Sequence, residues 1–325
     1  MRAIRTVFLV FLLPVLPGFP DATAQMQRPL LGFVVGTNQI DVRAVLGIPG
    51  AAVMSDRLQL PAEVEKVHFA PKQQYAVLER NTDLPMSILT FAGSEPGPIF
   101  DVAGILNKAD VLSFSPNGTK LVLYSSAERR LQLINGLPEA GQVVREINSD
   151  DLPEEDLRFV ALNDTGLTLL VATNQSIYRV AKGRPPEFLN NVGNLVGMRF
   201  RPQSDDALTL DSDIGELSLL QNLESSPSRR LLLDGLNIDT HTILQIDDEA
   251  AIIANKTANV VWQVDLGTSV IQEFLLSTSP VTLQDLRASH SFLLSYDDDQ
   301  PAWILSKSEE TRAVYFVPRA NLRRK

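Results

Sequence analysis

A degenerate repeat of about 43 residues runs through this chain and constrains its fold more than any other feature. Each copy has an apolar strand with a large apolar residue, here called the anchor, then a polar turn and a second apolar strand. The clearest copy spans residues 111–123, where Phe114 is followed by a Ser-Pro-Asn-Gly turn and by Leu121. Strand-rich repeats of this period are typical of β-propellers, in which each repeat forms one blade of a ring.

Six anchors recur at spacings of 38 to 48 residues. They are Phe69, Phe114, Leu162, Phe200, Ile246 and Leu286, and the second apolar stretches begin at Ala76, Leu121, Leu169, Ala207, Ile252 and Phe292. Most of the intervening segments contain Pro, Asn, Asp or Gly, which suit the central positions of tight turns. Further short apolar runs bounded by Gly, Pro, Asn and Asp supply third and fourth strands, and no convincing amphipathic helix follows residue 24.

The residues before the first anchor predict a seventh blade. Residues 31–35, 40–46 and 51–54 fit its second, third and fourth strands, so its first strand is missing. Residues 314–318 could supply that strand, because their pattern repeats that of residues 67–71 and the pairing would cover an exposed sheet edge. The competing interpretation makes 314–318 the fourth strand of the last blade, and the spacing slightly favours it. Both predict an all-β propeller of seven four-stranded blades, with six or eight blades as alternatives.

Residues 1–24 have the features of a secretory signal peptide. Two arginines precede an apolar stretch at 7–16, and a small-residue cleavage motif, Ala-Thr-Ala, ends at Ala24. The stretch is shorter than the ~20 apolar residues of a spanning helix. The sequence therefore predicts a cleaved signal peptide at 1–24, a single propeller domain at 25–325 without a membrane span, and a periplasmic or extracellular location.

Composition narrows the classes of function. The chain has no cysteine, which excludes disulfides, thiolate metal sites and a cysteine nucleophile. Without Arg2, Arg5 and Asp21 of the signal peptide, 27 basic and 38 acidic residues remain, a net charge of −11. A protein with this charge is not expected to bind nucleic acid or an anionic membrane.

Candidates for catalysis or metal binding are few. The three histidines are His68, expected to pack in a first strand, His290, expected to be solvated in a turn, and His241, and no Gly-x-Ser-x-Gly motif is present. The acidic stretches 211–215 and 297–299 resemble parts of calcium loops, but they lack later ligands and occupy a hairpin-tip position filled elsewhere by Asn, Ser and Thr. No catalytic residue, metal site or cofactor is therefore predicted.

The position four residues before each anchor lies where the innermost strand of a blade begins. It holds Glu65, Asp110, Arg158, Val196, Thr242 and Thr282. Loops into inner strands surround one mouth of the central channel of a propeller, and ligand sites favour such concave places. Glu65, Asp110 and Arg158, with His241 beside its own position, are therefore the candidate ligand-binding residues of a funnel. The simpler interpretation, which the sequence alone favours, is that these positions are polar because water reaches them.

The stretch Phe-Ser-Pro-Asn-Gly-Thr-Lys-Leu at 114–121 resembles the repeat of bacterial WD-like, TolB-like and YVTN-type propellers. The Gly-His and Trp-Asp pairs of eukaryotic WD repeats and the Tyr-Val-Thr-Asn tetrapeptide are absent. The resemblance implies binding or scaffolding outside the cytoplasm. Some propeller relatives are lactonases with an axial metal ringed by carboxylates and Asn, and this sequence does not match that ring.

The expected function is non-catalytic recognition of a protein, peptide or glycan, through one face of the ring or its funnel. The alternative is a metal-dependent hydrolase or lactonase with its ion on the axis. A third option is a structural envelope protein without a small-molecule site. Convergence of several carboxylate and Asn side chains at one funnel mouth would favour the enzyme.

Overall fold

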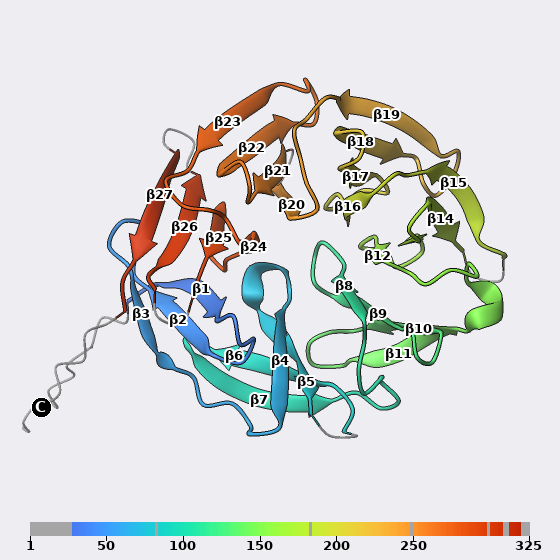
Figure 1. The fold of residues 1–325 in the computed structure, drawn as a ribbon. Coiled ribbons are helices and arrows are strands. Elements are labelled where there is room, and N and C mark those ends of the chain that lie inside the picture. The colour runs from blue at the N-terminus through green and yellow to red at the C-terminus, as the bar shows by residue number, and fades with distance from the viewer. Residues whose placement is uncertain are drawn as a thin grey trace, which may run out of the picture.

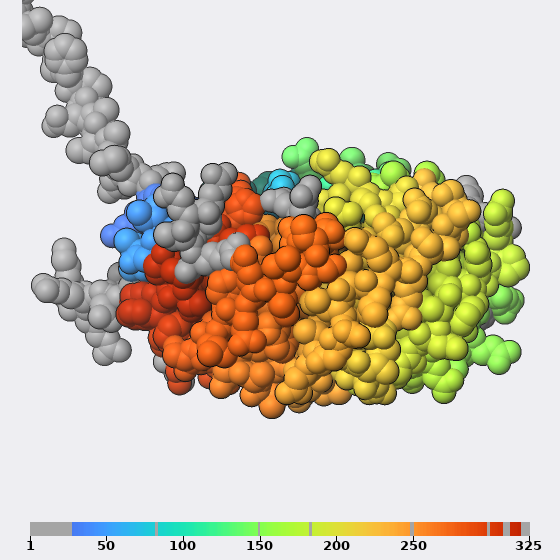
Figure 2. Space-filling view, turned by 90° about the horizontal axis from the view of Figure 1, so that it is seen from above, coloured from blue at the N-terminus to red at the C-terminus, as the bar shows by residue number. Residues whose placement is uncertain are grey.

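The computed structural model describes residues 28–81, 84–181, 184–247, 250–297, 300–307 and 312–319, so the predicted signal peptide lies outside the described residues. Seven antiparallel sheets surround a central axis as the blades of a propeller (Figure 1). Seen from the side, the ring is a thick disc (Figure 2). The predicted all-β, seven-bladed propeller is confirmed.

The blades follow the order of the chain, and in blades 2 to 7 the first strand is innermost (Figure 1). Blade 1 contains β1 (Leu30–Val35), β2 (Val42–Leu46) and β3 (Val53–Arg57), and blade 2 contains β4 (Val64–Phe69), β5 (Tyr75–Arg80), β6 (Ser87–Ala92) and β7 (Glu95–Asp101). Blade 3 contains β8 (Val111–Phe114), β9 (Lys120–Ser125), β10 (Arg130–Asn135) and β11 (Gln142–Ile147), and blade 4 contains β12 (Phe159–Leu162), β13 (Leu169–Ala172), β14 (Ser176–Val180) and β15 (Glu187–Asn191). Blade 5 contains β16 (Leu195–Phe200), β17 (Ala207–Asp211), β18 (Glu216–Gln221) and β19 (Ser228–Leu233), and blade 6 contains β20 (Thr242–Asp247), β21 (Ala250–Asn255), β22 (Val260–Asp265) and β23 (Ile271–Leu275). Blade 7 contains β24 (Gln284–Asp285), β25 (Ser291–Ser295), β26 (Ala302–Lys307) and β27 (Arg312–Val317).

Helical structure is nearly absent from the described part of the chain. It is limited to two three-residue 3-10 turns, η1 (Pro71–Gln73) and η2 (Ser149–Asp151). No helix in the described ranges is long and apolar enough to cross a membrane.

The anchors lie at or beside the ends of the innermost strands. Phe69, Phe114, Leu162 and Phe200 are the last residues of their strands, Ile246 is the penultimate residue of β20, and Leu286 directly follows β24. Each anchor belongs to a different hydrophobic cluster. The repeat pattern therefore predicted which residue of each inner strand packs into the protein.

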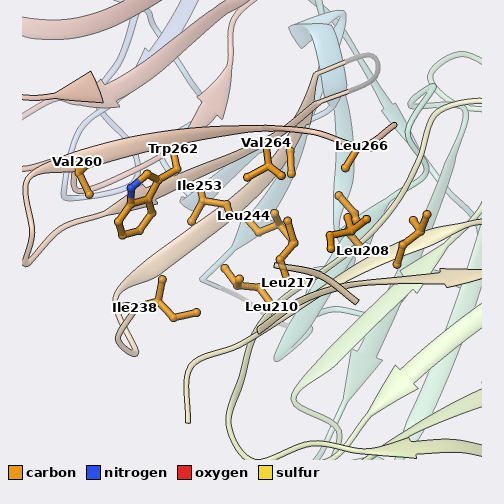
Figure 3. Packing of buried hydrophobic residues seen from close by; sticks show 13 residues of the cluster. Leu208, Leu210, Leu217, Ile238, Leu244, Ile253, Val260, Trp262, Val264 and Leu266 are labelled. Carbon is orange, nitrogen blue, oxygen red and sulfur yellow. The ribbon is translucent and has the colours of Figure 1, made fainter. Parts of the chain in front are cut away.

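Neighbouring blades share these hydrophobic clusters. In one of them, Leu208, Leu210 and Leu217 of blade 5 meet Leu244 and Trp262 of blade 6 (Figure 3). Burying one such leucine contributes roughly 1.5–3 kcal/mol, so the contacts between sheets are a main source of stability. Trp262 is 7% exposed and packs between the two blades.

Blade 1 differs from the predicted four-stranded blade. Of the two closure models, the one that brings residues 314–318 to its inner edge is wrong, because β27 pairs along its whole length with β26 and completes blade 7. The chain then passes the outer strand of blade 1, where Met54 N–H donates to Pro318 O at 3.0 Å. Blade 1 keeps three strands in the described structure, and its inner edge is covered by other means.

The side chain of Gln73 occupies the place of the missing inner strand. Phe33 N–H donates to Gln73 Oε1 at 2.6 Å, and Gln73 Nε2 donates to Phe33 O at 2.8 Å. Ala288 N–H of blade 7 donates to Leu31 O at 2.8 Å, so a second carbonyl of this edge is also paired. Turn η1 is the short blue coil near the centre of the ring (Figure 1). Its residues Lys72 and Gln73 adopt left-handed backbone conformations, with φ of 56° and 48°.

Turns between first and second strands also link neighbouring blades. The carboxylate of Asp164 accepts from Asn117 N–H of blade 3 at 2.7 Å and from Gln203 N–H of blade 5 at 2.8 Å. The hydroxyl of Tyr75 in blade 2 donates to Gly118 O of blade 3 at 2.6 Å. These contacts hold the channel-lining strands in a fixed ring.

Candidate functional site: the axial channel

The first half of the channel is a cavity of about 330 Å³ where the inner strands begin. It is lined by Asp110, Arg158, Val196 and Thr242, four of the six residues that occupy the position before the anchors, and also by Ser113 and Arg199. Thr282, the fifth, lines the neighbouring cavity described below. Five of the six strand-start positions therefore face the channel.

Two of the four predicted site residues line this first cavity. Asp110 Oδ2 accepts from the backbone N–H and the hydroxyl of Ser126, at 2.6 and 2.7 Å, and these bonds hold the pKa of Asp110 below its usual range. Arg158 reaches the same cavity, and its guanidinium makes no hydrogen bond or ion pair with any described residue. The carboxylate of Asp110 thus stabilises a turn, while the guanidinium of Arg158 is available to a ligand.

The other two predicted residues do not line the cavities of the channel. Glu65 forms an exposed ion pair with Lys108, at 3.2 Å between Oε2 and Nζ. His241 is exposed, and its backbone N–H donates to Asp239 Oδ1 at 2.8 Å. The four residues therefore do not converge on one site.

The second half of the channel is a cavity of about 290 Å³ beside η1. The residue directly before each anchor supplies much of its lining: His68, Ser113, Arg199, Gln245 and Asp285, with only Ala161 of this set outside it. Successive residues of a strand point to opposite sides, so a residue next to an anchor points away from the core and toward the axis. The sequence analysis did not predict these channel-lining residues, although each of them stands directly before an anchor in the repeats.

Arg199 and Asp285 dominate the electrostatics of the second cavity. The side chain of Arg199 is exposed to the solvent of the channel. The surrounding protein still desolvates it and lowers its pKa, against the opposing effect of Asp285. Burial also raises the pKa of Asp285 to about 6, although the side chain of Gln245 and the charge of Arg199 favour its ionised form. The two groups attract each other without forming a direct ion pair.

His68 and His290 have acidic partners. His68 Nε2 lies 3.5 Å from Oε2 of Glu79, a carboxylate that is 5% exposed, and this contact is the largest cause of a lowered pKa of Glu79. His68 lies in the predicted first strand, but its side chain is 31% exposed and lines the second cavity, so it is not packed in the core as predicted. His290 lies in the predicted turn and is partly solvated, but its Nδ1 is also 2.9 Å from Asp247 Oδ1, a contact that the sequence did not indicate.

No group of three or more His, Asp or Glu side chains in the described ranges is arranged to hold a metal ion. The carboxylate of Asp211, the first residue of one calcium-like stretch, accepts from the backbone N–H groups of Gly193, Asn194 and Asp213. Asp211 thus acts in turn formation, as the alternative interpretation of that stretch predicts. The stretch 297–299 lies partly outside the described residues.

Comparison with known proteins finds solved structures with a similar fold. No family model matches the sequence, and no curated protein matches it. Among solved structures, it is similar to a proposed 6-phosphogluconolactonase from Bacteroides fragilis, with 10% identity, 91% of this chain and 95% of that chain covered, and a TM-score of 0.56. It is also similar to the periplasmic gluconolactonase of Pseudomonas aeruginosa, with 13% identity, 90% and 96% coverage, and a TM-score of 0.55. The propeller domain of Myceliophteria thermophila Swd1 matches with 11% identity, 78% and 86% coverage, and a TM-score of 0.55. At these identities the likeness shows a β-propeller and leaves the activity open.

Proposed function

We propose that this protein is a non-catalytic recognition propeller that takes a polar part of a protein, peptide or glycan into its axial channel. The observation that carries the proposal is the 330 Å³ cavity, whose lining includes the guanidinium of Arg158 without a partner among the described residues. Concave sites with a few polar groups are the usual places of ligand binding. The predicted signal peptide supports action in the periplasm or outside the cell.

Binding arrays of glycans and peptides, followed by calorimetry on the hits, test this proposal with the purified chain from Gln25 to Lys325. Arg158→Ala should weaken binding at least about tenfold, because truncating a central arginine of a binding site has effects of that size. His241→Ala is the matched control, since His241 is exposed and lies outside the cavity lining. Equal affinity in the Arg158 and His241 variants would remove the channel from recognition.

A hydrolase or lactonase is the second candidate. Two of the similar structures carry gluconolactonase names, and the channel contains a carboxyl with a pKa of about 6 next to a guanidinium. Such a carboxyl suits proton transfer near neutral pH, and a guanidinium can stabilise a developing oxyanion. The residues described offer no three-carboxylate or histidine cluster for an axial ion, so this candidate rests on Asp285 and Arg199.

Hydrolysis of glucono-δ-lactone, measured with and without added Ca²⁺, Mg²⁺ and Mn²⁺, distinguishes the two candidates. The recognition proposal predicts no turnover above the spontaneous rate under either condition. Turnover that is lost in Asp285→Asn but kept in His241→Ala would replace recognition by catalysis.

A further inference from the structure

Two arginine side chains reach the axial channel without a protein partner. Arg158 and Arg199 come from blades 4 and 5, and both line the first cavity. Neither guanidinium makes a hydrogen bond or direct ion pair with the described residues. A guanidinium has five N–H donors and binds carboxylate and phosphate groups through two parallel hydrogen bonds.

The surroundings of Arg199 favour a charged partner for its guanidinium. The side chain of Arg199 is exposed to the solvent of the channel, but the surrounding protein disfavours its charge. A guanidinium that is only partly hydrated gains from a charged hydrogen-bond partner. Meanwhile the whole chain carries a net charge of −10, so two unpaired arginines in its channel oppose the overall charge.

The size of the channel limits what can bind there. Its two larger cavities have volumes of about 330 and 290 Å³, and both share Arg199 and Ser113 with a third cavity of about 70 Å³. Small-molecule sites start at roughly 300 Å³, so each cavity suits a small molecule better than a folded partner. Turn η1 narrows the second cavity, since Pro71 is part of its lining.

We propose that the axial channel binds a small free organic acid or phosphate anion on Arg158 and Arg199, in competition with Asp285. This inference goes beyond the proposed recognition function, because the ligand that it names is a small free anion. Ionised Asp285 attracts Arg199, so an arriving anion must displace that attraction. The charged and titratable groups that face Asp285 are Arg199 from β16, Asp247 from β20, Lys72 from η1 and His68 from β4.

Because Asp285 competes with the anion for Arg199, the affinity for the anion should depend on pH. Between pH 8 and pH 5 the carboxyl of Asp285 becomes protonated, because its pKa is about 6. The anion then meets Arg199 without a competing charge, so affinity should rise as pH falls. His68→Gln, which removes the imidazole from the lining of the same cavity, should leave this pH dependence in place.

Calorimetric titration at constant ionic strength with citrate, inorganic phosphate and acetate tests the inference. Citrate or phosphate should bind more tightly than acetate, and Arg199→Gln and Arg158→Gln should each weaken binding at least about tenfold, the effect of losing a bidentate charged contact. Arg184→Gln, an exposed arginine outside the lining, should bind like the unchanged chain. Asp285→Asn should bind more tightly at pH 8 and keep only the pH dependence that comes from protonation of citrate and phosphate themselves.

Arg199→Lys covers the case in which Arg199→Gln does not fold, because it keeps the charge and loses the two-pronged contact. Unchanged affinity in the Arg158 and Arg199 variants, or no binding of citrate and phosphate at millimolar concentrations, would overturn the inference. If a peptide or glycan binds in an Arg158-dependent way while these anions neither bind nor compete, the anion inference fails and the recognition function stands. If the anions bind and no peptide or glycan does, the anion inference stands and the recognition function fails.

Discussion

The side-chain amide of Gln73 makes both backbone hydrogen bonds of Phe33, at 2.6 and 2.8 Å, and so replaces one residue of an inner β-strand. Gln73 is fully buried, and it comes from blade 2 while Phe33 belongs to blade 1. A primary amide has the donor and the acceptor of a peptide group, which lets one side chain satisfy a strand edge. The ring is therefore closed at its axis by a side chain and at its rim by the chain beyond β27.

Gln73→Asn tests the closure at the axis. Asn tolerates the left-handed backbone at this position but is one methylene shorter, so it cannot reach both groups of Phe33. Leaving a buried N–H and C=O unpaired should lower the free energy of unfolding by about 2–4 kcal/mol in urea denaturation. The exposed neighbour offers a control, Gln74→Asn, which should change stability by less than about 0.5 kcal/mol. Equal midpoints for the two variants would show that the amide is not needed.

Deleting residues 312–325 tests the closure at the rim. The deletion removes β27, uncovers β26 and breaks the bond between Met54 and Pro318. It also removes Val317, which is 2% exposed, so we expect a loss of at least about 3 kcal/mol or of the cooperative transition in thermal melting. Deletion of 320–325 alone is the comparison, because it keeps β27. A chain without β27 that melts like this control would contradict the role of β27 in closure.

Asp164→Ala tests the link between turns. Asp164 accepts backbone N–H groups from both neighbouring blades, and its loss leaves two donors to water. The partly solvated site limits the expected loss to about 1–2 kcal/mol. Asp164→Asn keeps an acceptor oxygen and should lose less. Identical denaturation curves for the Ala variant and the unchanged chain would mean that the blades hold their spacing without this carboxylate.

Asp285→Asn should affect stability in a pH-dependent way. The folded pKa of Asp285 is raised, so its contribution to stability is fully present below about pH 3.8 and is lost as pH rises through about 6. The difference in unfolding free energy between the variant and the unchanged chain should therefore shift in favour of the variant as pH rises from 4 to 8. The expected shift is up to about 3 kcal/mol.

Asp110→Asn supplies a test of the opposite sign. The lowered pKa of Asp110 contributes stability above the ordinary range of an aspartate, and this contribution is lost as pH falls through the folded value. Its variant should be less stable at pH 8, and the loss should fade in acid. Parallel pH profiles for the Asp285 and Asp110 variants would contradict both assignments.

The repeat predicted the fold because one pattern governs strand, turn and core in every blade. Phe114 and Phe200 lie where the anchors place them, and the second strands begin within two residues of the predicted positions. Blade 1 was predicted less well, since no strand propensity can reveal that a glutamine 40 positions away will replace a strand. Long-range contacts of this kind depend on the closed ring and not on local sequence.

The candidate site was predicted in part. Position relative to the anchor correctly brings Asp110 and Arg158 to the channel, because strand starts face the axis. Glu65 lies at the same position in its repeat, yet its side chain pairs with Lys108 and is absent from the cavity lining. The position of Arg199 follows from the alternation of side chains within a strand, which directs the residue beside Phe200 away from the core, and the rule of strand starts does not include it.

That alternation has an evolutionary consequence. At the end of each inner strand, a residue that packs between blades is next to a residue that faces the channel, as Phe200 is next to Arg199. A substitution at the second kind of position changes the ligand environment with little effect on interblade packing, and effects on separate contact sets are close to additive. Channel-facing residues can therefore be exchanged, blade by blade, without repacking the contacts between blades.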